Sequence, residues 1–210
     1  MTRAPSLCAV ILAGGDSTRM GTDKALLPWP NNRAGQVSGQ TFLSAAIQVL
    51  SLFNDMVIVV AGKNEANLTP VAYAGGAVVV RNPAPERGQF SSLQVGLQEV
   101  LNHGRDAAMV TLVDRPPPKP ATLDALRSAF AELRADQWAV VPDYGGKHGH
   151  PVLLGREMIE LFLKAPATAS ARDIEHQNRQ HILYLAVDDP AVTLNVNTPE
   201  DYAALSTLPG

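Results

Sequence analysis

The 210-residue chain has only one cysteine, Cys8, and therefore cannot form a disulfide within itself. The cytoplasm, a reducing compartment, is the simplest location for such a chain. It has no apolar run close to the roughly 20 residues that a membrane-spanning helix needs, so we expect no membrane partner. Its formal net charge of −3 lacks the basic excess typical of nucleic-acid-binding proteins. With 46% hydrophobic and 18% charged residues, the composition favours a globular protein and excludes a disordered one.

Apolar runs rich in Val, Ile and Leu alternate with helical patterns along most of the chain. Several runs are apolar throughout, which is typical of a parallel sheet covered on both faces. We expect strands at residues 8–13, 56–61, 77–81, 107–113, 138–142, 151–154, 182–187 and 192–196, and helices at 41–53, 91–103, 120–134, 156–164, 170–179 and 199–205. This order predicts one α/β domain over residues 1–210. Its open, mostly parallel sheet would be flanked by helices, with a site at the carboxyl ends of the strands.

The segment LAGGDSTRMGTDKALLP, residues 12–28, directly follows the first expected strand. Its glycine spacing does not fit the dinucleotide fingerprint, and Lys24 is followed by alanine where a phosphate-binding P-loop has Ser or Thr. The residues alone leave two interpretations open. One is a plain turn. The other is a loop in which the backbone N–H groups of Gly14 and Gly15 approach an anion, with Arg19 and Lys24 adding positive charge.

This segment resembles the L-A-[AG]-G-x-S-x-R-M-G-x-x-K-x-L-L-P signature of the molybdenum cofactor cytidylyltransferases and guanylyltransferases. The match is long and has no gaps. The resemblance implies a Rossmann-like nucleotidyltransferase (GT-A-like) fold, in which the loop wraps the base and triphosphate of a nucleoside triphosphate. The implied catalytic cations are Arg19 and Lys24. The implied nucleotide-binding residues of this segment are Leu12, Ala13, Gly14, Gly15 and Lys24.

The segment VTLVDRPPP, residues 110–118, brings Asp114 to the end of an expected strand. On the residues alone, a loop aspartate that accepts backbone hydrogen bonds is the more ordinary interpretation. In the resembling family an aspartate at this point holds Mg²⁺, an ion that prefers hard oxygen ligands. The resemblance therefore implies that Asp114 is catalytic and is the first metal ligand. Arg115 departs from the family pattern and either contacts phosphate or faces solvent.

The segment NVNTPEDY, residues 195–202, precedes the last expected helix, for which Thr198 is a natural N-cap. In related nucleotidyltransferases an Asp or Asn just ahead of this helix completes the metal shell. Asn195 and Asn197 are the two candidates here, and Asn195 ranks first. Cytidylyltransferases typically have Asp at these points, so this chain would supply less negative charge to the ion.

The segment RGQFSSLQVGL, residues 87–97, predicts a glycine turn and then a helix capped by Ser91 or Ser92. It resembles the cytidylyltransferase version of the family, which implies that Gly88 and Ser92 approach the base or the ribose. The chain also carries the segment ATASARDI, residues 167–174. This stretch lacks the glycine and the acid of its family counterpart, which puts a role for Arg172 in doubt.

The segment GGKHGHPVLL, residues 145–154, contains two histidines but no further His or Cys at zinc-ligand spacing. A zinc site is therefore disfavoured. The segment resembles a stretch that lines the pterin side of the family's cleft. The resemblance implies that His150 contacts the substrate.

Taken together, the resemblances imply a Mg²⁺-dependent nucleotidyltransferase that binds a nucleoside triphosphate and a molybdopterin-type acceptor, with a molybdoenzyme or its maturation chaperone as a further partner. The acceptor's phosphate would attack the α-phosphate and release pyrophosphate. Residues 12–15 look like the guanylyltransferase version, whereas residues 88–97 and 149–154 favour CTP. CTP is thus the expected nucleotide and GTP the alternative. Two other functions stay open: transfer to a sugar or polyol phosphate, and nucleotide binding without catalysis.

Overall fold

The computed structural model describes residues 6–15, 22–29 and 39–205. Arg19, one of the two catalytic cations implied by the resemblance, lies outside these ranges. Within them, no helix combines the length and the apolar character needed to cross a membrane.

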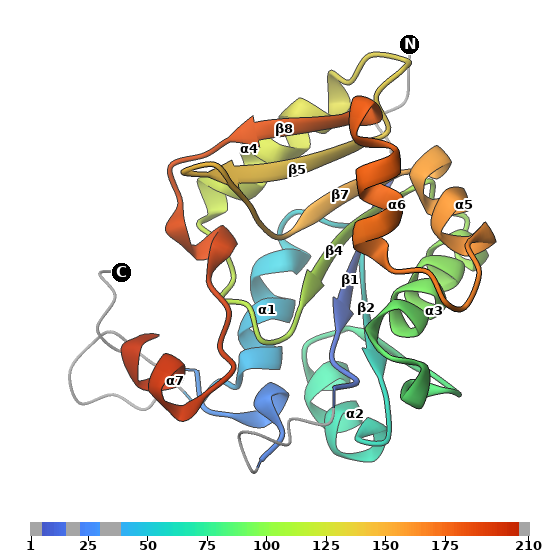
Figure 1. Ribbon diagram of the computed structural model, residues 1–210. Helices are drawn as coiled ribbons and strands as arrows, with labels where there is room; N and C mark the ends of the chain where they lie inside the picture. Colours follow the sequence, from blue (N-terminus) through green and yellow to red (C-terminus); the bar gives the residue numbers. More distant parts are fainter. Residues whose placement is uncertain (1–5, 16–21, 30–38, 206–210) are drawn as a thin grey trace.

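Strand β1 (Leu7–Leu12) is an interior strand of the sheet, and its six residues, apolar throughout, are all buried. It pairs in parallel with β2 (Met56–Ala61) on one side and with β4 (Ala107–Leu112) on the other. Strand β3 (Val78–Arg81) pairs in parallel with β2 and extends this half of the sheet. The carboxyl ends of these four strands therefore lie along one edge, as Figure 1 shows for β1, β2 and β4.

Beyond β4 the sheet becomes mixed. Strand β7 (Val152–Gly155) runs antiparallel to β4 and to β5 (Ala139–Tyr144), whereas β8 (Ile182–Ala186) runs parallel to β5. The short strand β6 (Lys147–His148) pairs with the end of β5. Segment 145–151 connects β5 to β7 and is too short for a parallel crossover, so the two strands are antiparallel. Over the described residues the eight strands follow the order β3-β2-β1-β4-β7-β5-β6, with β8 on β5. The prediction of an α/β fold with a mostly parallel sheet is confirmed.

Helices cover both faces of this sheet (Figure 1). The α-helices are α1 (Phe42–Ser51), α2 (Glu65–Ala74), α3 (Gln89–Asn102), α4 (Pro120–Ala131), α5 (Arg156–Lys164), α6 (Ala171–Gln177) and α7 (Pro199–Leu205). The 3₁₀ helices are η2 (Lys24–Leu26), η3 (Pro85–Arg87), η4 (Arg179–His181) and η5 (Pro190–Thr193).

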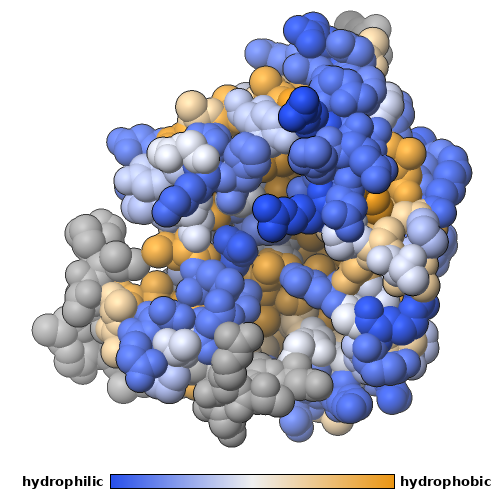
Figure 2. Space-filling model, in the orientation of Figure 1, coloured by the Kyte–Doolittle hydropathy of each residue, from blue (hydrophilic) through white to orange (hydrophobic). Residues whose placement is uncertain are grey.

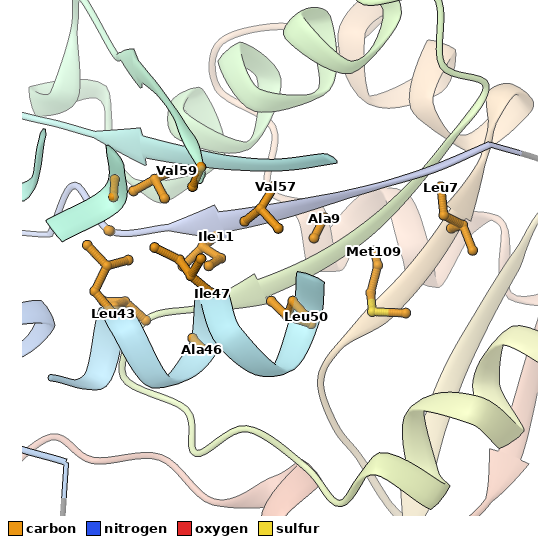
Figure 3. Close-up of a cluster of buried hydrophobic side chains, with 14 of the residues drawn as sticks. Leu7, Ala9, Ile11, Leu43, Ala46, Ile47, Leu50, Val57, Val59 and Met109 are labelled. Atoms are coloured by element: carbon orange, nitrogen blue, oxygen red, sulfur yellow. The ribbon is translucent and has the colours of Figure 1, made fainter. Parts of the chain in front are cut away.

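Successive residues of β1 point to opposite faces, so the sheet separates two hydrophobic clusters. The odd-numbered residues of β1 pack with α1, α2 and α4, and Figure 3 shows Leu43, Ile47 and Leu50 of α1 directed towards the strands. The even-numbered residues pack with α3, α5 and α6. On this second face α3 lies very close to the sheet, since a Cβ added at Gly96 would be 2.6 Å from Val10 Cγ1.

Cys8 is fully buried in the second cluster, as expected for a thiol within an apolar strand. Burial raises the pKa of the Cys8 thiol to about 12. The thiolate is therefore scarce at neutral pH, and this cysteine is chemically inert.

The structure corrects one expected element and contains one helix that the sequence analysis does not predict. The sequence predicts a strand at 192–196, but that segment begins within η5 and leaves it as a loop. Asp189 accepts a hydrogen bond from the backbone N–H of Ala191, and Pro190 is the first residue of the helical turn. The start of the segment is therefore a 3₁₀ helix and not a strand. The helix that the sequence analysis does not predict is α2, which contains Pro70 at an interior position, where proline is normally unfavourable.

The expected cap of α3 is also wrong. The helix begins at Gln89 with Gly88 as its N-cap residue, and Gly88 has a positive φ of 86° that favours glycine. Ser91 and Ser92 therefore lie inside the first turns. Their hydroxyl groups both accept hydrogen bonds from the buried Asn82 Nδ2, at 2.8 and 2.9 Å.

Candidate active site

The carboxyl ends of β1 and β4 open into a cavity of about 690 Å³, called here the first cavity. Segments that are far apart in the sequence meet at its walls. Ten of the residues implied by the family resemblance line it: Leu12, Ala13, Gly14, Gly15, Lys24, Gly88, Ser92, Asp114, Asn195 and Asn197. The edge of the sheet predicted to carry the site is thus where these residues converge.

The glycine segment is fixed against the end of β2. A Cβ added at Gly14 would lie 2.9 Å from Gly62 N, and one added at Gly62 would lie 2.7 Å from Gly14 O. Only glycines allow the two chain segments to approach so closely. A Cβ at Gly15, in contrast, would meet nothing within 4 Å. Gly14 therefore serves the packing of the loop, and Gly15 presents open backbone to the cavity.

Asn64, which sequence reasoning did not single out, ties Lys24 to this loop. Its Nδ2 donates hydrogen bonds to Ala13 O at 2.9 Å and to Asp23 Oδ2 at 2.6 Å. The other oxygen of Asp23 accepts from Ala25 N at 3.0 Å and so caps η2, the turn that carries Lys24. The lysine therefore leaves a backbone that is joined to the end of β1.

Lys24 and Asp114 form an ion pair in the first cavity, although 90 positions separate them in the chain. Lys24 Nζ lies 3.1 Å from Asp114 Oδ2 and donates a second hydrogen bond to Asn197 Oδ1 at 2.8 Å. The two charged side chains are only 14% and 21% exposed. The ammonium group thus lies between two oxygens that the resemblance implies are metal ligands.

Short backbone contacts hold Asn197 in place. Val196 N donates to Asp114 O at 2.9 Å, which joins segment 194–197 to the end of β4. Asp201 Oδ2 accepts from Asn197 N and Thr198 N, and Asp201 N donates to Thr198 Oγ1. Thr198 therefore caps α7 as the sequence predicts. Asn195 also lines the cavity but is exposed, so Asn197 is the asparagine that contacts the charged pair.

The residues present suit a hard divalent cation. Asp114 Oδ1 is buried and, over the described ranges, has no hydrogen-bond partner. A buried carboxylate oxygen without a partner is costly, and a metal ion would satisfy it. In the described part of the chain, no three His, Cys, Asp or Glu side chains are grouped so that they could hold a metal ion. One carboxylate with amide oxygens fits Mg²⁺ or Mn²⁺ far better than zinc.

A second cavity of about 630 Å³ adjoins the first and shares Leu12, Gln89 and Leu112 with it. Its walls are mostly apolar side chains of α3, β4, β7 and α5, with charged residues among them. In the orientation of Figure 1, Figure 2 shows apolar residues at the bottom of a hollow that is surrounded by hydrophilic residues. The charged residues that line this second cavity are Arg87, Arg115, Arg172 and Glu175.

His150 lies in the second cavity and not beside the Lys24–Asp114 pair. Burial, helped by the positive charge of Arg115, lowers the pKa of His150 to about 4. The imidazole is therefore neutral at pH 7, with Nδ1 3.5 Å from Val110 O. Arg115 itself donates to Leu194 O at 3.4 Å, and burial lowers its pKa.

Comparison with known proteins identifies the family of the chain. The model of the MobA-like NTP transferase domain matches residues 9–182, most of the chain. The chain belongs to this family. The enzyme class predicted from the sequence, nucleotidyltransferase, is confirmed.

Relatives cover nearly the whole chain. A probable molybdenum cofactor guanylyltransferase from Rhodopirellula baltica is 30% identical over 204 residues, which cover 94% of this chain and 90% of the relative. The molybdenum cofactor cytidylyltransferase of Escherichia coli is 24% identical over 194 residues and 92% of each chain.

Solved structures share the fold over a similar length. Rv0371c from Mycobacterium tuberculosis H37Rv superimposes with a TM-score of 0.77, at 26% identity, over 97% of this chain and 99% of that one. A crystal structure of the same protein in complex with manganese has a TM-score of 0.73 at 25% identity, and covers 95% of this chain and 97% of that one.

Proposed function

We propose that this nucleotidyltransferase transfers a nucleoside monophosphate from CTP or GTP to the phosphate of a molybdopterin-type acceptor, with release of pyrophosphate. The observation that carries the proposal is the direct junction of two unlike cavities at Leu12, Gln89 and Leu112. One holds open glycine backbone, a lysine and a carboxylate. The other is apolar with arginines. The names of the relatives from Rhodopirellula baltica and Escherichia coli support the same acceptor.

The first cavity suits the triphosphate. The backbone at Gly15 is open to an approaching ligand, and the Lys24 ammonium supplies positive charge for phosphate oxygens. The Lys24 side chain is long and flexible. Its ammonium group can therefore move from the Asp114 carboxylate to a phosphate that enters the cavity. There it would stabilise the charge that develops on the departing pyrophosphate.

We further propose that Asp114 and Asn197 hold Mg²⁺, with Asn195 as an additional oxygen donor at the rim. The unpartnered Asp114 Oδ1 supports this assignment, as does the manganese complex of the Mycobacterium tuberculosis relative. When bound, the ion would neutralise charge on the phosphate oxygens. The nucleophile needs no general base, since a phosphate monoester is already ionised near neutral pH.

The second cavity suits a flat heterocycle with an anionic end. Phe90, Leu93 and Phe162 provide apolar surface, and the guanidinium groups of Arg87 and Arg115 can bind phosphate oxygens. Holding both substrates next to each other converts a bimolecular reaction into an effectively unimolecular one. Positioning and charge neutralisation would then supply most of the rate.

CTP and GTP are separated by experiment. The purified chain is mixed with Mg²⁺, reduced molybdopterin with or without molybdate, and either triphosphate, and pyrophosphate release is followed. We expect release with one triphosphate at a kcat/KM at least tenfold above the other. The sequence of residues 88–97 favours CTP, whereas the Rhodopirellula baltica relative is a guanylyltransferase by name.

The same assay includes a sugar 1-phosphate and a polyol phosphate as acceptors. Faster release with either of them than with molybdopterin would replace the proposed acceptor. Tight triphosphate binding without pyrophosphate release from any acceptor would instead identify a nucleotide-binding protein that has lost catalysis.

A further inference from the structure

Glu175 is the one acidic side chain in the wall of the second cavity, over the residues that the structure describes. It is on α6, the short helix that Figure 1 places in front of the sheet near α5. Burial raises the pKa of its carboxyl group. Glu175 is half-buried, and a carboxyl group that is partly removed from water is more favourable when it accepts hydrogen bonds.

Within the described ranges, however, the protein supplies no ion-pair or hydrogen-bond partner, although the charge of Glu175 is close enough to help raise the pKa of Tyr184. No Lys, Arg or His nitrogen lies within 4.0 Å of the Glu175 carboxylate, and no described donor makes a hydrogen bond to it. Arg115, in the same cavity, donates to a backbone carbonyl instead. Glu175 therefore does not serve to neutralise an arginine of the cavity wall, and its hydrogen-bonding capacity is available to a ligand.

The chemistry of the cavity restricts what that ligand can be. Aromatic and aliphatic side chains, Phe90 and Leu112 among them, favour a flat ring, and the arginines favour an anionic group at one end. A carboxylate with two oxygens is the natural acceptor for two parallel N–H donors on one edge of a ring. A 2-amino-4-oxo ring system has such an edge, made of the ring N3–H and the 2-amino group.

We propose that Glu175 determines the specificity of the second cavity by accepting two hydrogen bonds from the N3–H and 2-amino groups of a 2-amino-4-oxo heterocycle. This inference rests on the proposed function and identifies the group that selects its acceptor. A ring with a 2-oxo group in place of the 2-amino group would bring an acceptor oxygen against the carboxylate. The protein would then reject it, because two acceptors would face each other in a partly buried place.

The test uses two small fluorescent rings and needs no turnover. Pterin carries the 2-amino-4-oxo edge, and lumazine carries 2,4-dioxo groups on the same bicyclic frame. Their dissociation constants are measured by fluorescence titration with the wild-type chain, Glu175→Gln and Glu132→Gln. The last is a matched control, because Glu132 is exposed and follows α4 far from the cavity lining.

We expect the wild-type chain and Glu132→Gln to bind pterin at least tenfold more tightly than lumazine. In Glu175→Gln the amide would donate to the 2-oxo group, so pterin affinity should fall about tenfold and the preference should shift towards lumazine. Affinity of the same variant for CTP and GTP, and its thermal unfolding, report whether the fold is intact.

An unchanged preference in a folded Glu175→Gln chain would overturn the inference, and so would an absence of pterin binding to the wild type. The pyrophosphate assay reports separately on the proposed function. Release of pyrophosphate with molybdopterin but no role for Glu175 in ring binding would refute only this inference. A Glu175-dependent preference for pterin without pyrophosphate release from any acceptor would refute only the transfer reaction.

Discussion

The two adjoining cavities differ in what their walls are made of. The first is built from backbone and from a charged pair that is already neutralised, with Gly14 packed against Gly62 and Lys24 against Asp114. The second is built from side chains, with apolar groups around arginines and an acid that has no described partner. On the proposed function, the backbone N–H groups and the mobile cation of the first cavity would bind a phosphate chain whatever its base, and the side chains of the second would select one kind of ring.

The two cavities also differ in how their walls are held in place. In the first cavity, hydrogen bonds donated by Asn64 and Val196 and accepted by the Asp201 carboxylate fix the segments that carry Lys24 and Asn197. In the second, the charged residues Arg172 and Glu175 are on α6, a helix of only seven residues, beside the apolar side chains of α3, β4, β7 and α5. We therefore expect changes in the first cavity to affect chemistry and stability strongly, and changes in the second to affect mainly which acceptor is used.

The largest expected effect comes from Asp114→Asn, which removes the only carboxylate that touches the Lys24 ammonium over the described residues. Turnover should fall by about 100- to 1,000-fold, since loss of one group that stabilises transition-state charge typically costs this much. The fold and triphosphate binding should persist. Steady-state pyrophosphate release gives kcat, and fluorescence titration gives the nucleotide affinity.

The control for this variant is Asp124→Asn, because Asp124 is exposed on α4 and lines neither cavity. It should leave kcat within about twofold of the wild type. If Asp114→Asn behaved like this control, the metal assignment and the chemical role of the first cavity would both be lost.

A smaller effect is expected from Gly14→Ala, which tests whether the first cavity depends on backbone contact. The added Cβ would lie 2.9 Å from Gly62 N and 3.1 Å from Ala61 C, so one strand end must move. We expect the free energy of unfolding to fall by about 1–3 kcal/mol, as is usual for overpacking. Gly15→Ala is the matched control, since its Cβ meets nothing within 4 Å, and urea unfolding should place it within about 0.5 kcal/mol of wild type.

Much of the first cavity is predictable from the sequence because its residues occur in continuous segments. Residues 12–28 and 110–118 can be recognised as continuous sequence motifs. The two segments follow neighbouring parallel strands, so they lie at the same edge of the sheet. Asn64 and Asn82 could not be found in this way. The side-chain amide of Asn64 donates to Asp23, which is far away in the sequence. The side-chain amide of Asn82 donates to Ser91, which is buried in another element. No local pattern distinguishes them from ordinary polar residues.

The second cavity is harder to predict for the same reason. Phe90, Arg115 and Glu175 come from three separate elements, and each has an ordinary local explanation. Phe90 fits an amphipathic helix, and Glu175 fits the exposed face of a short one. Only the packing of α6 near the ends of β4 and β7 brings them to one hollow. The wrong strand at 192–196 has a similar origin, since the apolar spacing of Val192 and Val196 does not reveal the turn made by Pro190.

His150, in the second cavity, should make the stability of the protein depend on pH. Its pKa is about 4 in the folded chain, lowered mainly by burial, and about 6.5 in an unfolded one. The folded state therefore favours the neutral ring. Its contribution to stability is complete above pH 6.5 and is lost as the pH falls towards 4. Between pH 7 and pH 5 this should remove about 2 kcal/mol of unfolding free energy.

The measurement compares urea unfolding of the wild type and His150→Gln at pH 7 and at pH 5. The wild type should lose about 2 kcal/mol more than the variant over this interval. If the wild type and the variant lost the same amount of unfolding free energy, His150 would be hydrated in the folded chain. The contrast between an apolar second cavity and a polar first cavity would then be wrong.

The smallest expected effect concerns the charged pair itself. Lys24 Nζ lies 3.1 Å from Asp114 Oδ2 and 2.8 Å from Asn197 Oδ1, so in the nucleotide-free chain it competes with a divalent cation for the same oxygens. Lys24→Met has a side chain of similar length without the charge. It should bind Mn²⁺ about tenfold more tightly in the absence of nucleotide, because the repulsion between the two cations is gone. Calorimetric titration measures this affinity.

The same substitution should act in the opposite direction once nucleotide is present. The triphosphate then brings its own negative charge, and the missing ammonium group should weaken CTP or GTP binding and lower kcat together. Lys164→Met is the control, since Lys164 is exposed and pairs only with Glu160 in the described part of the chain. Tighter Mn²⁺ binding with weaker triphosphate binding would show that Lys24 holds the metal position until the substrate arrives. Equal Mn²⁺ affinity in both chains would mean that the ion is held elsewhere, and that the pair only braces the cavity wall.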